Sequence, residues 1–211
     1  MIELYPITEH AVEFQNCLMN WYKKEARDLP WRADPSPYKV WISEIMLQQT
    51  RVDTVIPYFT RFISEIPTIQ DLAQVPEEKL LKLWQGLGYY NRALNLKKAA
   101  RVIMEQFNGY IPCDVRDLLF LPGIGEYTAG AIASIAFGKA VPAVDGNVLR
   151  VMARITVNRG DISNSKVKKQ IESFVISLLP SKNAGIFNQA LMDLGAMICL
   201  PNGEPKCSQC R

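Results

Sequence analysis

Several features that would place this 211-residue sequence in other classes of protein are missing from it. No apolar run approaches the roughly 18 to 20 residues that a bilayer-spanning helix needs. The acidic start, Met1-Ile2-Glu3-Leu4, has no signal-peptide pattern. The composition, 48% apolar and 21% charged, is that of an ordinary globular protein. We therefore expect a cytoplasmic protein that does not associate with membranes.

The alternation of apolar and polar residues that marks β-strands is also almost absent. Helical periodicity runs through nearly the whole chain, and it predicts an all-α fold. Pro57 is expected to interrupt or begin a helix, because proline lacks a backbone N–H donor. The clearest helices in the second half are predicted at about 146–156, 165–179 and 183–198.

Cysteine is scarce in the first half of the chain and clustered at its end. Cys17 and Cys113 are isolated, and we expect both to be buried among apolar side chains. Cys199, Cys207 and Cys210 lie close together in sequence. In a chain without a secretory signal, such a cluster favours a metal or iron–sulfur site over a disulfide.

The segment Leu121-Pro122-Gly123-Ile124-Gly125 predicts a turn between two short helices. Its glycines allow positive φ and close approach of the backbone, and its N–H groups suit an anion such as a DNA phosphate. From the glycine spacing alone, a plain corner packed through glycine is about as good an explanation. A dinucleotide fingerprint is excluded because its third glycine would stand at Thr128, and no Gly-Lys-Ser/Thr of a P-loop occurs.

The charge between residues 137 and 170 is strongly basic, with seven lysines and arginines against Asp145 and Asp161. This excess fits a DNA-binding surface and a solvated basic face equally well.

Two carboxylates stand out from the rest. Glu44 lies among apolar residues and before Gln48-Gln49, and in a helix Trp41 and Leu47 flank it by one turn on either side. Burial of this kind raises the pKa of a carboxyl group, which suits a proton donor, although most glutamates on amphipathic helices are surface residues.

Asp145 precedes Gly146-Asn147 at the expected start of a helix, where aspartate is a common N-cap. Capping would hold this carboxylate rigid and ionised. A proton-donating carboxyl paired with an ionised one is the arrangement that cleaves glycosidic bonds, and the N-glycosidic bond of a nucleotide demands the same two roles.

With these features, the sequence resembles the MutY-type adenine DNA glycosylases of the helix–hairpin–helix glycosylase superfamily, which also contains endonuclease III. The resemblance runs from about residue 20 to residue 210. It rests, besides the Leu121–Gly125 turn, on the segments Leu29-Pro30-Trp31-Arg32, Ser43-Glu44-Ile45-Met46-Leu47-Gln48-Gln49-Thr50, Gly86-Leu87-Gly88-Tyr89-Tyr90, Ala143-Val144-Asp145-Gly146-Asn147-Val148 and Met192-Asp193-Leu194-Gly195-Ala196.

The resemblance implies catalysis of base excision repair on double-stranded DNA that carries adenine opposite 8-oxoguanine or guanine. Glu44 would protonate N7 of the extruded adenine, and Asp145 would stabilise the sugar cation. Tyr127 would lie between the two carboxylates, and Asn147 would position Glu44 or the substrate. Gln49 and Tyr89 would wedge into the duplex opposite and beside the extruded nucleotide. The remaining implied roles are DNA contacts for Gln48, Thr50, Leu121, Gly123 and Gly125, and a base pocket for Trp31, Arg32 and Leu47.

Tyr127 also bears on the type of reaction. Endonuclease III has a lysine at the similar position, which forms a Schiff base with the sugar, and tyrosine cannot do so. The resemblance therefore implies a monofunctional glycosylase. Alternatives are a related mismatch glycosylase for another base, such as the superfamily's thymine-mismatch enzyme, and a non-catalytic helix–hairpin–helix module that binds DNA.

The resemblance further implies a [4Fe–4S] cluster held by four cysteines. Cys199, Cys207 and Cys210 supply three, with one residue more than the family's spacing between the first two. The fourth would lie near position 216, so we expect a truncated sequence. The resemblance also implies a C-terminal domain that reads 8-oxoguanine, and we expect this sequence to lack it.

We therefore expect two helical lobes in a monomer, nucleoid-associated if bacterial. Residues 28–136 would form a six-helix barrel that ends in the helix–hairpin–helix. Residues 1–27 and 137–211 would form the iron–sulfur lobe.

Overall fold

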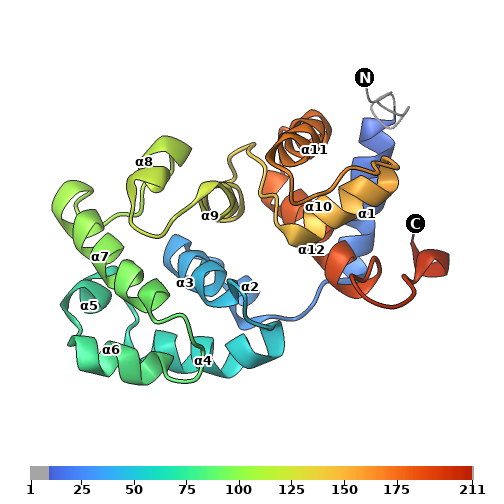
Figure 1. The fold of residues 1–211 in the computed structure, drawn as a ribbon. Helices are drawn as coiled ribbons and strands as arrows, with labels where there is room; N and C mark the ends of the chain where they lie inside the picture. The colour runs from blue at the N-terminus through green and yellow to red at the C-terminus, as the bar shows by residue number, and fades with distance from the viewer. Residues whose placement is uncertain (1–9, 211) are drawn as a thin grey trace. The chain divides into compact units, whose positions relative to one another are not determined.

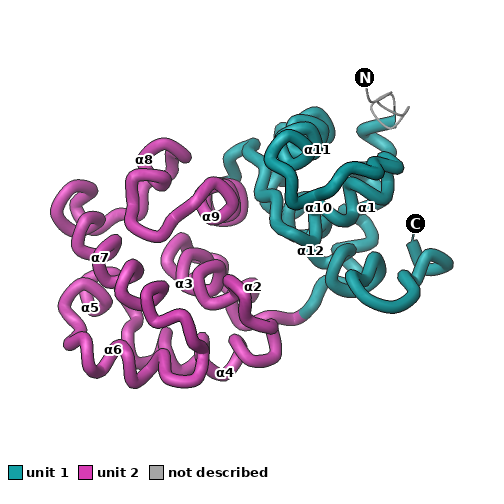
Figure 2. Tube along the Cα trace, viewed as in Figure 1, with its two compact units in different colours: residues 1–27, 138–211 teal, residues 28–137 magenta. Residues whose placement is uncertain are grey.

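A computed structural model describes residues 10–210 of the protein (Figure 1). These residues contain helices and no strand, so the predicted all-α fold is confirmed. Every helix among them is too short or too polar to cross a bilayer. The chain divides into two compact units, Met1–Arg27 with Gly138–Arg211 and Asp28–Phe137 (Figure 2). The first nine residues and the last one lie outside the described part.

The unit of residues 28–137 contains eight α-helices and one π-helical turn among the described residues. Their bounds are α2 Pro30–Ala33, α3 Pro37–Leu47, α4 Val52–Glu65, α5 Ile69–Gln74, α6 Glu77–Trp84, α7 Asn91–Gln106, α8 Val115–Phe120, α9 Glu126–Ala131 and the π-helix Ile132–Ala136. Side-chain caps begin several of these helices, as at Ser36, Thr68 and Asp114. Trp31 packs edge-on against Phe59 with ring centroids 5.3 Å apart. The helices that carry these two rings, α2 and α4, both pack against α3 and help to bury it.

The other unit is built around α12, Ala184–Met197, on which α1, Ala11–Glu25, and α10, Gly146–Ile155, both pack. α11, Ser165–Leu178, packs on α10, and a short 3₁₀-helix covers Cys207–Gln209. Phe14 and Phe187 join α1 to α12 edge-on at 6.2 Å. The three helices predicted for this part of the sequence end within one residue of the observed bounds.

Two local expectations are wrong. Pro57 neither interrupts nor begins a helix but lies inside α4. Its ring removes one backbone N–H donor from the helix, and packing of the apolar face of α4 offsets that loss. Cys17 and Cys113 are exposed, although isolated cysteines are usually buried. Packing of the whole helix outweighs the preference of Pro57 in α4 and of Cys17 in α1, whereas Cys113 lies in the segment between α7 and α8.

Candidate active site of a nucleic-acid enzyme

Glu44 lies in the most buried stretch of α3, with only 6% of its surface exposed. The hydroxyl of Tyr127, the second residue of α9, donates a hydrogen bond to Oε2 of Glu44 at 2.6 Å. α3 also packs against α9 and the π-helix that continues it. Burying a carboxyl group is unfavourable unless it is hydrogen-bonded, so this contact joins two predicted site residues that are far apart in sequence.

The Leu121–Gly125 turn joins α8 to α9 within the same unit. Gly123 has φ +81°, and a Cβ there would lie 2.8 Å from Cβ of Asn95, so both conformation and space require glycine. Gly125 has φ −100° and no atom within 4 Å of an added Cβ, so neither conformation nor packing requires glycine there. Leu121, expected to contact DNA, is buried, and its backbone N–H and carbonyl bond within the turn to Leu118 and Ile124.

Gln48, Gln49 and Thr50 follow the end of α3. Nε2 of Gln48 lies 3.5 Å from Oγ1 of Thr128, and Oγ1 of Thr50 donates to the carbonyl of Gln48 at 3.3 Å. Gln49 is exposed and left-handed, with φ +56°. Tyr89, 62% exposed, is also left-handed, with φ +48°. Such conformations are strained for residues other than glycine, and they occur at Gln49 and Tyr89, two of the predicted DNA contacts.

The predicted base-pocket residues lie on neighbouring helices of the same unit. Trp31 and Arg32 belong to α2, and Leu47 is the last residue of α3, against which α2 packs. Trp31 is 6% exposed and stacks on Phe59, so it serves the core as well. The pocket itself stays a prediction.

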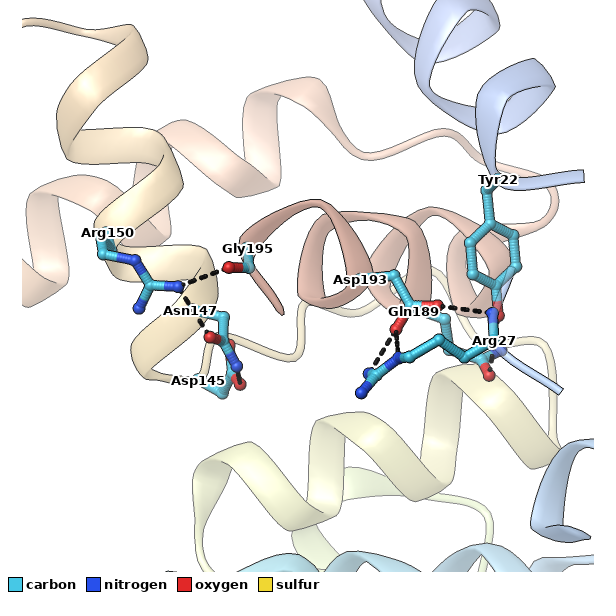
Figure 3. Close-up of polar contacts among 8 residues, drawn as sticks. All are labelled: Tyr22, Arg27, Asp145, Asn147, Arg150, Gln189, Asp193 and Gly195. Carbon is cyan, nitrogen blue, oxygen red and sulfur yellow. Dashed lines mark hydrogen bonds and ion pairs between the residues drawn. The ribbon is translucent and has the colours of Figure 1, made fainter. Parts of the chain in front are cut away.

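Asp145 lies in the other unit and caps α10, the role that its position in sequence indicated. Its Oδ1 accepts from the backbone N–H of Val148 at 2.8 Å, and its Oδ2 accepts from Nδ2 of Asn147 at 2.7 Å (Figure 3). An ionised carboxylate only accepts hydrogen bonds, so these contacts suit it. Asn147, expected beside Glu44 or the substrate, contacts Asp145 directly.

Arg150 fixes the orientation of Asn147, and the sequence had not singled it out for this role. Its Nη2 donates to Oδ1 of Asn147 at 2.9 Å and to the carbonyl of Gly195 at 2.8 Å, while its Nε donates to the carbonyl of Cys199 at 3.0 Å (Figure 3). Burial lowers the pKa of Arg150, an effect partly offset by the charges of Cys199 and Asp145. Arg150 is therefore one basic residue of the 137–170 excess that serves internal structure.

α12 supports this arrangement through two residues of the Met192–Ala196 segment. A Cβ at Gly195 would lie 2.6 Å from Cβ of Asn147, so only glycine lets Asn147 pack there. Asp193, fully buried, accepts from Nε of Arg27 at 2.9 Å (Figure 3). Nearby, the hydroxyl of Tyr22 donates to Oε1 of Gln189 at 3.3 Å. The segment thus anchors both the end of α1 and the Asp145 network.

The three C-terminal cysteines follow α12. Nη1 of Arg154 lies 3.2 Å from Sγ of Cys199. Partial burial, followed by the charges of Cys199 and Cys207, raises the pKa of the Cys210 thiol. Among residues 10–210, however, no three histidine, cysteine or acidic side chains have an arrangement that would hold a metal ion. As placed, these thiols do not fit a four-ligand cluster.

Comparison with known proteins decides the family. Residues 42–176 match the model of the HhH-GPD superfamily of base excision DNA repair proteins. The chain belongs to this superfamily. The matched segment contains Glu44, Tyr127, Asp145 and Asn147, whereas Trp31 and the C-terminal cysteines lie outside it.

Among curated proteins, the chain is 47% identical to the adenine DNA glycosylase of Homo sapiens, over 98% of this chain and 39% of that protein. It is 46% identical to the adenine DNA glycosylase of Buchnera aphidicola subsp. Schizaphis graminum, over 93% of this chain and 57% of that protein. The chain therefore spans about two to three fifths of these relatives.

Among solved structures, a thermostable thymine-DNA glycosylase is 30% identical, with a TM-score of 0.86 over 97% of this chain and 94% of that one. A non-covalent endonuclease III–DNA complex, 24% identical, has a TM-score of 0.80 over 96% of this chain and 92% of that one. The second likeness shows a shared fold.

Proposed function

We propose that this protein is a monofunctional DNA glycosylase that releases adenine mispaired with 8-oxoguanine or guanine. The observation that carries the proposal is the hydrogen bond from Tyr127 to the buried Glu44, in a chain 47% identical to an adenine DNA glycosylase. The capped carboxylate of Asp145 supplies the second group that the chemistry requires. Binding of double-stranded DNA is supported by the solved endonuclease III–DNA complex of the same fold.

The reaction begins with extrusion of the adenine, since its reacting atoms are unreachable inside the stack. Glu44 donates its proton to N7 of adenine, and the C1′–N9 bond breaks with its electron pair moving onto the base. Asp145 stabilises the oxocarbenium-like sugar that remains. Water then adds to C1′ and gives its proton to the carboxylate of Glu44, which restores the acid and leaves free adenine and an abasic site.

Other residues support these steps in the proposal. Tyr127 holds the carboxyl of Glu44, and Asn147 holds that of Asp145. Tyr127 has no amine, so no Schiff base with the sugar forms and the backbone is not cut. Trp31, Arg32 and Leu47 surround the base. The Leu121–Gly125 turn binds a phosphate through backbone N–H groups, which fixes register without reading sequence.

The test is single-turnover release of adenine from duplexes with A opposite 8-oxoguanine, guanine and thymine, beside Glu44→Gln and Asp145→Asn. We expect release from the first two duplexes and its loss in both variants, with DNA binding retained. The rate should fall as pH rises, because Glu44 must be protonated to act as an acid. A DNA-binding module would bind without any release, and that outcome would overturn the proposal.

A related glycosylase for another base is the second candidate, favoured by the 30% identity and TM-score of 0.86 to a thymine-DNA glycosylase. Thymine release from a G:T duplex under the same conditions, without adenine release, would favour this second candidate.

We further propose that Cys199, Cys207 and Cys210 contribute to a [4Fe–4S] cluster with a structural role. The spacing of the cysteines supports this, although the thiols must rearrange to bind metal. Iron and sulfide analysis of the purified protein tests the proposal, and absence of both would refute it.

A further inference from the structure

Arg92, the second residue of α7, connects the two loops that carry Gln49 and Tyr89. Its Nη1 donates to the carbonyls of Ile45 and Met46, both at 2.9 Å, and to that of Gln48. Its Nη2 reaches Oγ1 of Thr50 at 3.2 Å and the carbonyls of Leu87 and Gly88 at 3.1 and 3.3 Å. One guanidinium thus serves both loops.

The first set of contacts is made to the C-terminal end of α3. The last carbonyls of an α-helix have no partner within the helix, and they carry the negative end of its dipole. A cation that donates to several of them satisfies both needs. Arg92 therefore holds α3 in place up to Gln48, directly before Gln49.

The second set of contacts closes the loop before α7. Besides the bonds to Leu87 and Gly88, the guanidinium of Arg92 lies 5.5 Å from the ring centroid of Trp84 and 5.6 Å from that of Tyr89. Nε1 of Trp84 also donates to the carbonyl of Gly88 at 3.1 Å. Cation–π contacts of this geometry favour one placement of the Tyr89 ring.

The left-handed residues follow the carbonyls that Arg92 binds. Gln49 comes directly after Gln48, and Tyr89 directly after Gly88. Each left-handed conformation costs on the order of 1 kcal/mol and persists only where its surroundings impose it. Both side chains nevertheless remain exposed. Arg92 binds the carbonyl that directly precedes each of these two strained positions.

We propose that Arg92 is a positioning residue that sets Gln49 and Tyr89 in one fixed relation, as a paired wedge that enters the duplex. The proposal rests on the proposed function, since it concerns how the target nucleotide is extruded. Lysine cannot replace Arg92, because an ammonium is a point charge without the planar fork that reaches both loops and stacks on the rings.

The first experiment needs no DNA. Hydrogen exchange of the free protein is measured by mass spectrometry for Arg92→Lys and for Arg101→Lys. Arg101 lies on the same helix, and its Nε donates to the carbonyl of Ala73, in neither wedge loop. We expect exchange in segments 45–50 and 86–90 to rise together, by roughly tenfold, in the first variant alone. A rise in only one loop, in neither loop, or equally in both variants would overturn the proposal.

The second experiment follows unstacking of the duplex, with 2-aminopurine placed beside the target adenine. Arg92→Lys should abolish most of the fluorescence rise on binding and slow adenine release by about tenfold to 100-fold, the effect of losing charge-assisted hydrogen bonds. In a Gln49→Ala, Tyr89→Ala background, Arg92→Lys should add little, because it acts through those residues. Additive effects would contradict the proposal. If the wild type releases no adenine while the exchange result holds, the proposed function fails and the role of Arg92 stands.

Discussion

The hydroxyl of Tyr127 lies 2.6 Å from Oε2 of Glu44, which ties the first turn of α9 to the buried centre of α3. The hairpin before α9 and the carboxyl group on α3 are therefore linked by one side chain. A change in the hairpin that moved Tyr127 would also move a hydrogen bond to Glu44.

Tyr127→Phe removes that hydrogen bond and keeps the ring. Glu44 is neutral when it acts as an acid, and a hydrogen bond between neutral groups contributes about 0.5 to 1.5 kcal/mol, so adenine release should slow by roughly twofold to tenfold under single-turnover conditions. Tyr110→Phe is the matched control, since Tyr110 is 77% exposed in the same unit. Equal rates of adenine release for the two variants would show that Tyr127 does not contribute to the reaction.

Gly195→Ala should disturb the carboxylate of Asp145 from a distance. The added Cβ would lie 2.6 Å from Cβ of Asn147, so Asn147 must shift and its bond to Asp145 must weaken. We expect a loss of about 1 to 3 kcal/mol in the free energy of unfolding, the usual cost of overpacking, together with slower adenine release. Urea denaturation measures the first and single-turnover kinetics the second. An unchanged free energy of unfolding would show that α12 yields without strain.

Gly125→Ala should instead leave the stability almost unchanged and weaken DNA binding. No atom lies within 4 Å of the added Cβ, and φ at this position is −100°, so stability should change by no more than about 0.5 kcal/mol. If a phosphate approaches the backbone of the hairpin, the methyl group should weaken DNA binding by several-fold in a fluorescence-anisotropy titration. Retained affinity would favour the alternative explanation of the glycines, a turn shaped for packing only.

Tyr38 should make the fold sensitive to alkali. Its hydroxyl donates to the carbonyl of Ile66 at 2.8 Å, and burial, followed by the charge of Asp71, raises its pKa far above the ordinary value of 10.0. Below pH 10 the group is neutral in both states. Above pH 10 the hydroxyl of Tyr38 ionises in the unfolded chain but stays neutral in the folded protein, so the free energy of unfolding should fall as pH rises.

Tyr38→Phe should remove that part of the alkaline dependence and cost about 1 kcal/mol at neutral pH, because the carbonyl of Ile66 loses its partner. Denaturation at several pH values checks both effects. The exposed Tyr110 again provides the control, since Tyr110→Phe should leave the slope unaltered. A wild-type stability that stays flat above pH 10 would contradict the assignment.

The sequence by itself determined the local elements of this protein. Helical periodicity, the cap at Asp145 and the Pro-Gly-Ile-Gly turn all act over a few residues, so they can be recognised without knowledge of the fold. It also predicted Glu44 among apolar neighbours, because those neighbours lie one turn away on the same helix.

Only the tertiary structure decided which distant residues meet. The bond between Tyr127 and Glu44 spans 83 positions, and that between Arg150 and Cys199 spans 49. The exposure of Cys17 likewise depends on which face of α1 packs against α12, which no neighbour in sequence reveals. Local preferences select helices and turns, whereas the orientation of each polar side chain is set by long-range packing, in which buried groups must find partners.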